Sequence, residues 1–155
     1  MQSSIKDDIK KYYDLWFSIN AIYEKWAKAH GITSNTLFIF YIINEYSGSC
    51  TQQLICEKLQ LPKQTVNAIL QVVEKNGYIE KVPAQKDKRS KAILITDLGK
   101  QYIEQIMREL YSFEEFAFSK MDSIQRTNML ESNNNLVKNL AMSFDSIEKA
   151  RNIPK

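Results

Sequence analysis

Residues that break helices are scarce in this sequence, which has only 4 glycines and 3 prolines among 155 residues. Their scarcity argues against a loop-rich β fold, because turns between strands depend on these two residue types. No apolar run approaches the roughly 20 residues that a transmembrane helix needs. Residues 1–10 also lack the basic and then apolar layout of a signal peptide. We therefore expect a cytoplasmic protein with no membrane partner.

Cysteine and histidine are scarcer still. The two cysteines, Cys50 and Cys56, do not make a disulfide framework. The one histidine, His30, stands beside Gly31 at an expected helix end. No Ser-His-Asp or Cys-His arrangement and no glycine-rich phosphate loop can be assembled from this composition, and a closed zinc site would need carboxylates or ligands shared between subunits. The sequence predicts no enzyme, no metal site and no cofactor.

Helical periodicity dominates what is present. Apolar residues recur at steps of three and four from Ile5 to Ala27, which predicts a long amphipathic helix that stops near Gly31. Thr33 or Ser34 then caps a second helix, whose residues "NTLFIFYIINEY" are apolar on nearly every side. We expect this second helix to be buried.

The middle of the chain predicts two short helices and a hairpin. Thr51 can cap the first helix, Pro62 opens the second after a three-residue break, and Gly77 ends it. The expected buried face of the pair consists of Leu54, Ile55, Leu59, Val66, Ile69, Leu70 and Val73. With strands expected near 79–83 and 91–96, this order is typical of a winged helix-turn-helix.

The last third is again helical. After Thr96, one apolar stripe is expected to hold Leu98, Tyr102, Ile103, Ile106, Leu110, Phe113, Phe116 and Ala117. Asp122 and Gln125 have the spacing of a capping box before a final helix that runs to about residue 150. The run "NNN" at 133–135 is poor helix material, so we expect a kink or a frayed stretch there.

The predicted fold is mainly α with a small β-hairpin wing (α+β). It combines an N-terminal dimerisation helix (1–32), a winged helix-turn-helix lobe (33–96) and C-terminal helices that complete the dimerisation region (97–155). The terminal helices carry more apolar surface than one small lobe can cover, which favours a homodimer. A bundle within one chain is the alternative.

Positive charge is concentrated in one segment. Residues 57–91 hold eight basic and four acidic residues, a balance of +4, whereas the whole chain is only +3. Such a local excess is expected of a nucleic-acid-binding surface.

On the second short helix, polar residues face away from Val66. Gln and Asn can pair with adenine, and an Ala methyl can meet a thymine methyl, although a plain solvated face is the simpler alternative. The candidate major-groove residues are Gln64, Thr65, Asn67, Ala68 and Gln71. The candidate phosphate contacts are Lys63, Lys75, Lys86, Lys88, Ser90 and Lys91.

At the hairpin tip the sequence reads "QKDKRSK". A narrow minor groove attracts Arg through its negative potential, so Arg89 is expected to enter it. Asp87 would then accept hydrogen bonds from Arg89 and orient its guanidinium. The alternative is that Asp87 serves only as a turn residue.

The stretch "VNAILQVVEKNGYIEKVPAQKDKRSKAILITDLGK" resembles the signature region of MarR-family transcriptional regulators. The family's Glu-Lys-x-Gly-x-Ile/Leu, Asp-x-Arg and Leu-Thr-x-x-Gly patterns correspond to 74–79, 87–89 and 95–99, with Ile95 in the place of Leu. The resemblance implies a dimeric regulator of double-stranded DNA, most often a repressor acting on a pseudo-palindromic operator. Ala68 stands where many members carry Arg, which suggests an operator preference of its own.

The resemblance also implies modulation by a small aromatic or amphipathic effector, or by an oxidant. Effectors of the family bind between the DNA lobe and the dimerisation helices, where the candidate residues are Tyr12, Tyr13, Trp16, Phe40 and Tyr41. Plain core packing of these rings is the alternative. For thiol sensing, Cys50 at a helix start is expected to be the more accessible and Cys56 the more buried. Inert cysteines are the favoured interpretation, and a protein-interaction module without a DNA role would leave the basic wing unexplained.

Overall fold

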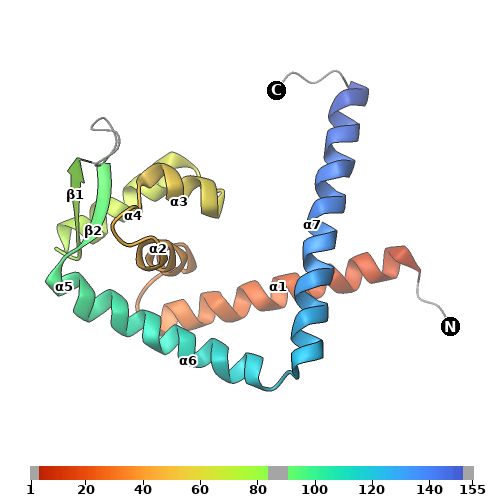
Figure 1. Ribbon diagram of the computed structural model, residues 1–155, viewed down its shortest axis with the longest axis horizontal. Helices are drawn as coiled ribbons and strands as arrows, with labels where there is room; N and C mark the ends of the chain where they lie inside the picture. The colour runs from red at the N-terminus through yellow and green to blue at the C-terminus, as the bar shows by residue number, and fades with distance from the viewer. Residues whose placement is uncertain (1–3, 84–90, 152–155) are drawn as a thin grey trace. The chain divides into compact units, whose positions relative to one another are not determined.

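The computed structural model describes residues 4–83 and 91–151. It divides into two compact units, the first ending at Glu109 and the second beginning at Leu110. The prediction of a mainly α fold with one β-hairpin is confirmed (Figure 1). In chain order the elements are α1 (Ile5–Ala29), α2 (Ser34–Glu45), α3 (Gln52–Leu59), α4 (Lys63–Lys75), β1 (Ile79–Pro83), β2 (Lys91–Ile95), α5 (Asp97–Gly99), the π-helical turn η1 (Lys100–Glu104), α6 (Gln105–Ser119) and α7 (Ser123–Arg151).

Local chemistry sets the ends of α1 and α2. Gly31 has a φ of +74°, so it takes the left-handed conformation that stops a helix most easily when no Cβ is present. Two residues later, the Thr33 hydroxyl accepts a hydrogen bond from the Thr36 N–H at 3.2 Å. Both features are those that the sequence predicts, and they turn the chain from α1 into the core.

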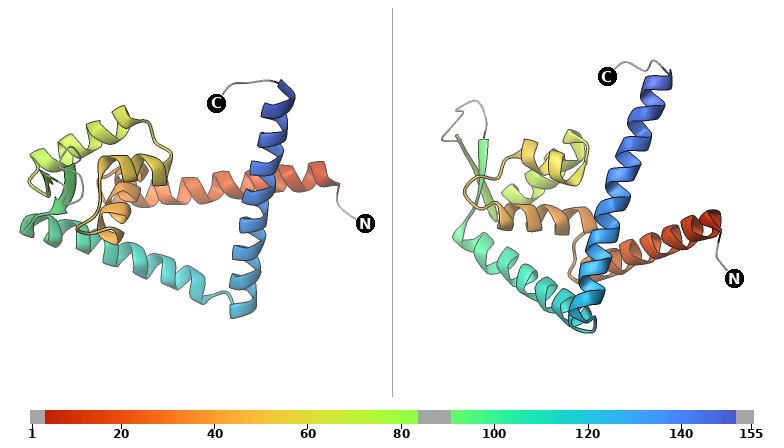
Figure 2. Two further views of the ribbon diagram at one scale, coloured as in Figure 1. Left: turned by 45° about the horizontal axis from the view of Figure 1, so that its top comes forward. Right: turned by 45° about the vertical axis from the view of Figure 1, so that its right-hand side comes forward.

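The core of the first unit is built around α2, which contacts α1, α3, β2 and η1. Figures 1 and 2 show α2 inside the lobe that α3, α4 and the hairpin form. The largest fully buried side chains of the first unit are Leu37, Ile39, Phe40, Ile43, Ile55, Val66, Leu70, Ile79, Ile93, Ile103 and Met107. The expected burial of the second helix is confirmed.

The hairpin pairs β1 with β2 in antiparallel register, from Ile79 opposite Ile95 to Pro83 opposite Lys91. The sequence did not predict a further contact on the other edge of β2. There Thr51 forms a bridge with Ala92, and the Ile93 N–H donates to the Cys50 carbonyl at 2.8 Å. The residues just before α3 are thereby tied to the outer edge of β2.

A junction of small residues joins α4, the hairpin and α5. The Thr96 hydroxyl donates to the Gly77 carbonyl at 2.5 Å and accepts from the Gly99 N–H at 2.9 Å. A Cβ on Gly99 would lie 1.8 Å from the Tyr78 carbonyl oxygen. The Thr-x-x-Gly spacing therefore has a physical cause, since only a hydrogen at Gly99 fits beneath Tyr78.

The predicted apolar stripe after Thr96 is partly wrong. Ile103, Ile106 and Met107 are buried, but Leu98 is 53% exposed. η1 lies between Leu98 and these residues, and a π-helical turn contains about one more residue than an α-helical turn, so the α-helical spacing from Leu98 onward is not kept. Met107, which the sequence analysis left out of the stripe, follows Ile103 by four residues and is buried.

In the second unit, α6 ends and α7 begins through the predicted capping box. The Asp122 N–H donates to Gln125 Oε1 at 3.0 Å, and the Gln125 N–H donates to Asp122 Oδ1 at 2.8 Å. The predicted kink at 133–135 is wrong, because α7 runs through these asparagines without a break. Asn133 instead donates its side-chain amide to the Met129 carbonyl at 2.8 Å along the same helix.

Large apolar side chains are exposed on both long helices. On α1 they are Ile5, Ile9, Tyr12, Tyr13, Leu15, Trp16, Phe17, Ile19 and Ile22, and on α7 they are Ile124, Leu130, Val137, Leu140, Met142, Phe144 and Ile147. A monomer rarely leaves so many large apolar groups in water. Among the described residues, no helix combines the length and the apolarity that crossing a bilayer requires.

Candidate nucleic-acid interface

The turn between α3 and α4 fixes how α4 is presented. Thr51 caps α3 by accepting from the Leu54 N–H at 3.1 Å, and Gln60 ends it with a left-handed φ of 52°. Pro62 is the residue that precedes α4, and its carbonyl accepts from the Val66 N–H at 3.1 Å. This tight connection holds α4 across the start of α3.

One face of α4 is buried and the opposite face is open. Val66, Leu70 and Val73 point into the lobe. The candidate DNA-contact residues Lys63, Gln64, Ala68, Gln71 and Lys75 are exposed, whereas Thr65 and Asn67 are half-buried. Packing of the apolar face therefore fixes which polar residues α4 offers to a partner.

The tip of the wing lies outside the described residues. It includes the candidates Lys86, Asp87, Lys88, Arg89 and Ser90. Insertion of Arg89 into a minor groove and its orientation by Asp87 stay predictions. Lys91, the first residue of β2, is described and is exposed.

A groove of about 460 Å³ lies between the start of α3, the start of α4 and the hairpin strands. Its lining residues are Thr51, Gln52, Gln53, Cys56, Lys63, Lys81, Lys91 and Ile93, and we call it the lysine groove. Lys81 forms an ion pair with Glu74, with 2.9 Å between Nζ and Oε2. The sequence analysis counted the charge of Lys81 but did not assign it to the site, because nothing in a linear pattern shows that β1 brings it beside α4.

The cysteines are placed opposite to expectation. Cys50 is fully buried, and this burial raises the pKa of its thiol to about 12, whereas Cys56 is half-buried. The hydrogen bond from Ile93 to the Cys50 carbonyl places this residue beneath β2. Because thiol chemistry needs an accessible thiolate, the structure does not support the redox-sensing alternative.

A second groove of about 500 Å³ lies in the first unit near the end of α4. Tyr78 and Tyr102 stack in its wall with ring centroids 4.4 Å apart, and Phe40 meets Tyr102 edge-on at 6.1 Å. Burial, and then the neighbouring Tyr78, raises the pKa of Tyr102. Lys28 from α1 and Asn76 after α4 add polar groups to the lining. We call it the tyrosine groove.

Of the five candidate effector-binding residues, Phe40 alone is among the residues that line the tyrosine groove. Tyr12, Tyr13 and Trp16 lie on the exposed part of α1, and Tyr41 is 37% exposed on α2. The sequence analysis missed Tyr78 and Tyr102 because they lie far apart in the chain, one before β1 and one in η1.

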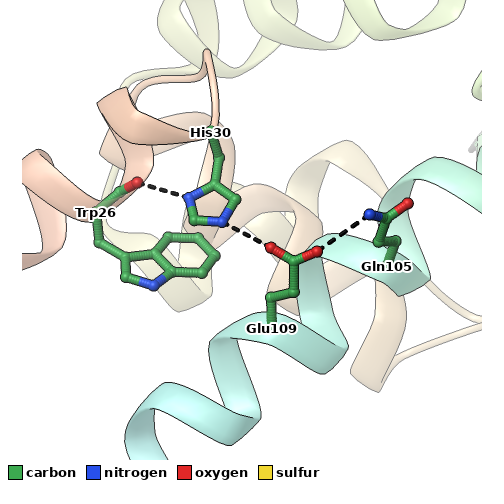
Figure 3. A network of polar contacts seen from close by, with 4 residues as sticks. All are labelled: Trp26, His30, Gln105 and Glu109. Carbon is green, nitrogen blue, oxygen red and sulfur yellow. Dashed lines mark hydrogen bonds and ion pairs between the residues drawn. The ribbon is translucent and has the colours of Figure 1, made fainter.

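His30 links the end of α1 to α6 (Figure 3). Its Nδ1 lies 2.8 Å from the Trp26 carbonyl and its Nε2 lies 2.8 Å from Glu109 Oε2, an arrangement that the doubly protonated ring satisfies. Gln105 donates to the other oxygen of Glu109 at 3.1 Å. This hydrogen bond, and then the one from His30, lowers the pKa of Glu109. His30 is therefore a helix-end residue with a structural contact, as the sequence suggested.

Comparison with known proteins finds similarity to transcriptional regulators. The model of the MarR family matches residues 30–90, from the end of α1 to the wing. The HTH-type transcriptional regulator PapX of Escherichia coli is 27% identical over 92 residues, which cover 54% of this chain and 56% of PapX. The match thus spans little more than half the length of that relative.

Solved structures share the fold over most of the chain. NMB1585, a MarR family regulator from Neisseria meningitidis, has a TM-score of 0.75 at 21% identity, covering 93% of this chain and 99% of its own. The S. aureus MepR structure, a complex with DNA, has a TM-score of 0.69 at 18% identity, covering 83% and 93%. Residues 30–90 are thus similar to the MarR family, and the chain shares the winged helix-turn-helix fold of these regulators.

Proposed function

We propose that this protein is a sequence-specific transcriptional regulator that binds double-stranded DNA as a homodimer, and that it acts as a repressor. The observation that carries the proposal is the orientation of α4. Its apolar face is buried in the lobe, while Gln64, Ala68 and Gln71 are exposed with Lys63 and Lys75 near its two ends. Amide side chains suit base edges and lysines suit phosphates. The MepR complex with DNA, a structure of the same fold, supports this use of the lobe.

The homodimer rests on the exposed apolar side chains of α1 and α7. Burying apolar surface stabilises association by about 25 cal/mol per Å², and a two-fold dimer would present two copies of α4. Such a dimer meets successive major grooves, so the operator should be a pseudo-palindrome with half-site centres about 10 base pairs apart. A repressor would act by occupying that operator.

Selection of bound sequences from a random duplex pool tests the proposal. The expected product is one pseudo-palindromic sequence. On it, Gln64→Ala or Gln71→Ala should weaken binding by about 1–3 kcal/mol and relax the base preference at one position in each half-site. Gln101→Ala, an exposed change in η1, is the matched control and should leave affinity unchanged. Recovery of an unenriched pool would contradict the proposal.

Modulation by a small molecule is supported by the tyrosine groove. Stacked rings and an apolar floor suit a flat ligand, and Lys28 suits an anionic group on it. The groove also includes Val72, Val73 and Asn76, at the end of the helix that would read DNA, so a ligand there would touch α4 directly.

Benzoate serves as a probe of that groove. A ligand that binds the native state alone raises the unfolding temperature, and we expect benzoate to do so for the native chain. Tyr102→Ala should abolish the shift, and the exposed Tyr12→Ala should retain it. Equal shifts in the two variants would exclude the tyrosine groove as the binding site.

A further inference from the structure

A single asparagine of the chain is followed by glycine. It is Asn76, which lies between Lys75 at the end of α4 and Gly77, and no other asparagine in the sequence precedes a glycine. The side-chain amide of asparagine is attacked most readily when glycine follows, because glycine has no side chain to hinder the attacking main-chain nitrogen. Asn76 is also exposed to solvent. The contacts of Gly77 therefore decide whether this attack can begin.

The reaction that such a pair undergoes is deamidation. The Gly77 nitrogen loses its proton and forms a bond to Cγ of Asn76, the bond from Cγ to Nδ2 breaks, and the side-chain nitrogen leaves as ammonia with that proton. Water then opens the resulting cyclic imide at either carbonyl. The product is aspartate, or isoaspartate with an additional carbon atom in the main chain. Water is the co-reactant, and nothing is oxidised or reduced.

The folded end of α4 gives the Gly77 nitrogen a different role. Its N–H donates to the Glu74 carbonyl at 2.9 Å, and the Tyr78 N–H donates to the Val73 carbonyl at 3.1 Å. With Gly77 at a φ of +76°, these are the two hydrogen bonds of a Schellman motif. The nitrogen that would attack Asn76 is thus a donor that closes the helix.

The backbone angle of Asn76 also opposes ring closure. Its ψ is −2°, so the Gly77 nitrogen eclipses the main-chain nitrogen of Asn76 and not its Cβ. Ring closure needs a rotation about this bond, which would break the Schellman motif. The Gly77 carbonyl is held as well, because the Thr96 hydroxyl donates to it at 2.5 Å. The attack therefore requires a local opening of the junction between α4 and β1.

We propose that Asn76 is a site of spontaneous deamidation whose rate is controlled by the end of α4, and that its conversion weakens DNA binding. The second statement rests on the proposed function, whereas the first does not. A carboxylate at this position would lie at the negative end of the α4 dipole and beside Lys75, an exposed candidate phosphate contact. An isoaspartate would also lengthen the main chain between α4 and β1. Both products disturb the surface that α4 presents.

Peptide mass spectrometry after incubation in mildly alkaline buffer tests the site. In urea, Asn76 should deamidate faster than every other asparagine of the chain. In the folded protein its rate should fall about tenfold or more, because the reactive state is then a minor, locally open one. An Asn76 that reacts no faster than the other asparagines in urea would overturn the site. Equal rates in the folded and the unfolded chain would overturn its control by α4.

Thr96→Val separates a local opening from global unfolding. It removes the hydroxyl bonded to Gly77 but leaves residues 75–78 unchanged, so the rate in urea should stay that of the native chain. The rate in the folded protein should rise about two- to tenfold, the effect of losing one hydrogen bond. Thr33→Val removes the cap of α2 instead and should leave the folded-state rate unchanged. Equal acceleration by both variants would show that global unfolding controls the reaction, against the proposal.

Asn76→Asp reproduces the charge of the product for binding to the selected operator. It should weaken binding about two- to fivefold, the usual effect of one unfavourable surface charge. Asn134→Asp makes the same charge change in the second unit and should leave affinity unchanged. If Asn76→Asp bound as tightly as the native chain, the effect on DNA would be refuted.

The incubated native protein completes the test. Its operator affinity should fall in step with deamidation, whereas Asn76→Gln, whose longer side chain disfavours ring closure, should keep its own starting affinity. An equal loss in both would assign the decline to another site and overturn the proposal. A chain that deamidates at Asn76 as described but selects no operator would support the site and contradict the proposed function.

Discussion

Gly99 is the residue at which the fold tolerates least change. The Tyr78 carbonyl lies where its Cβ would be, and the hydroxyl of Thr96 bonds to both Gly77 and Gly99. These contacts set the angle at which the hairpin leaves α4. Under the proposed function, this junction fixes how the hairpin and α4 are presented together to DNA.

Gly99→Ala should therefore lower the free energy of unfolding by about 1–3 kcal/mol, the usual cost of overpacking a closed site. Gln101→Ala changes an exposed residue two positions later and should stay within about 0.5 kcal/mol of the native chain. Urea unfolding measures both. Equal stability of the two variants would mean that the junction relaxes freely.

Glu109 gives the first unit a dependence on acid. Hydrogen bonds from Gln105 and then His30 lower its folded-state pKa, so its contribution to stability is present above the unfolded-state pKa of about 4.3. It is lost as pH falls through the lower folded-state value. The gap in urea midpoint between the native chain and Glu109→Gln should shrink between pH 7 and pH 3, whereas the exposed control Glu115→Gln should show no such trend. A constant gap for Glu109→Gln would contradict this linkage.

At the scale of elements, η1 separates the exposed Leu98 from the buried residues that follow it. Met107 is 2% exposed and Leu98 is 53% exposed. Met107→Ala should lower the free energy of unfolding by about 2–5 kcal/mol, because truncating a buried side chain leaves a cavity. Leu98→Ala should lower it by less than about 1 kcal/mol. Urea unfolding at one protein concentration checks the order. If Leu98→Ala proved the more destabilising change, Leu98 would lie on the buried stripe, as expected from the sequence.

Elements with local signals could be predicted from the sequence. The caps at Thr33, Thr51 and Asp122 satisfy backbone groups within four residues, so their chemistry is visible in a short window. The continuity of α7 through Asn133 was missed because propensity is a weak guide inside a long helix.

Features that depend on distant partners could not be read in that way. The burial of Cys50 depends on Ile93, the wall of the tyrosine groove joins Tyr78 to Tyr102, and Lys81 reaches the lysine groove only through the hairpin register. The polar face of α4 was predictable, because helical periodicity alone places Gln64 and Gln71 opposite Val66.

At the scale of the whole molecule, the exposed apolar side chains of α1 and of α7 support the proposed homodimer. Light scattering at micromolar concentration should give twice the chain mass of 18.1 kDa, and the unfolding temperature should rise with protein concentration. Leu140→Asp, on the exposed face of α7, should shift the mass toward the single chain, and Ser132→Asp is the matched control on a polar position. A concentration-independent mass of 18.1 kDa would exclude the dimer.

The unequal burial of the two thiols also allows the rate of a local opening to be measured in the native chain. A maleimide pulse should modify Cys56 in the folded protein, because Cys50 is sealed beneath β2. The slower reaction at Cys50 then reports how often β2 separates from the residues just before α3. Mass spectrometry of the two modified peptides would time that opening in the native sequence, with operator DNA present or absent, without introducing a label by mutation.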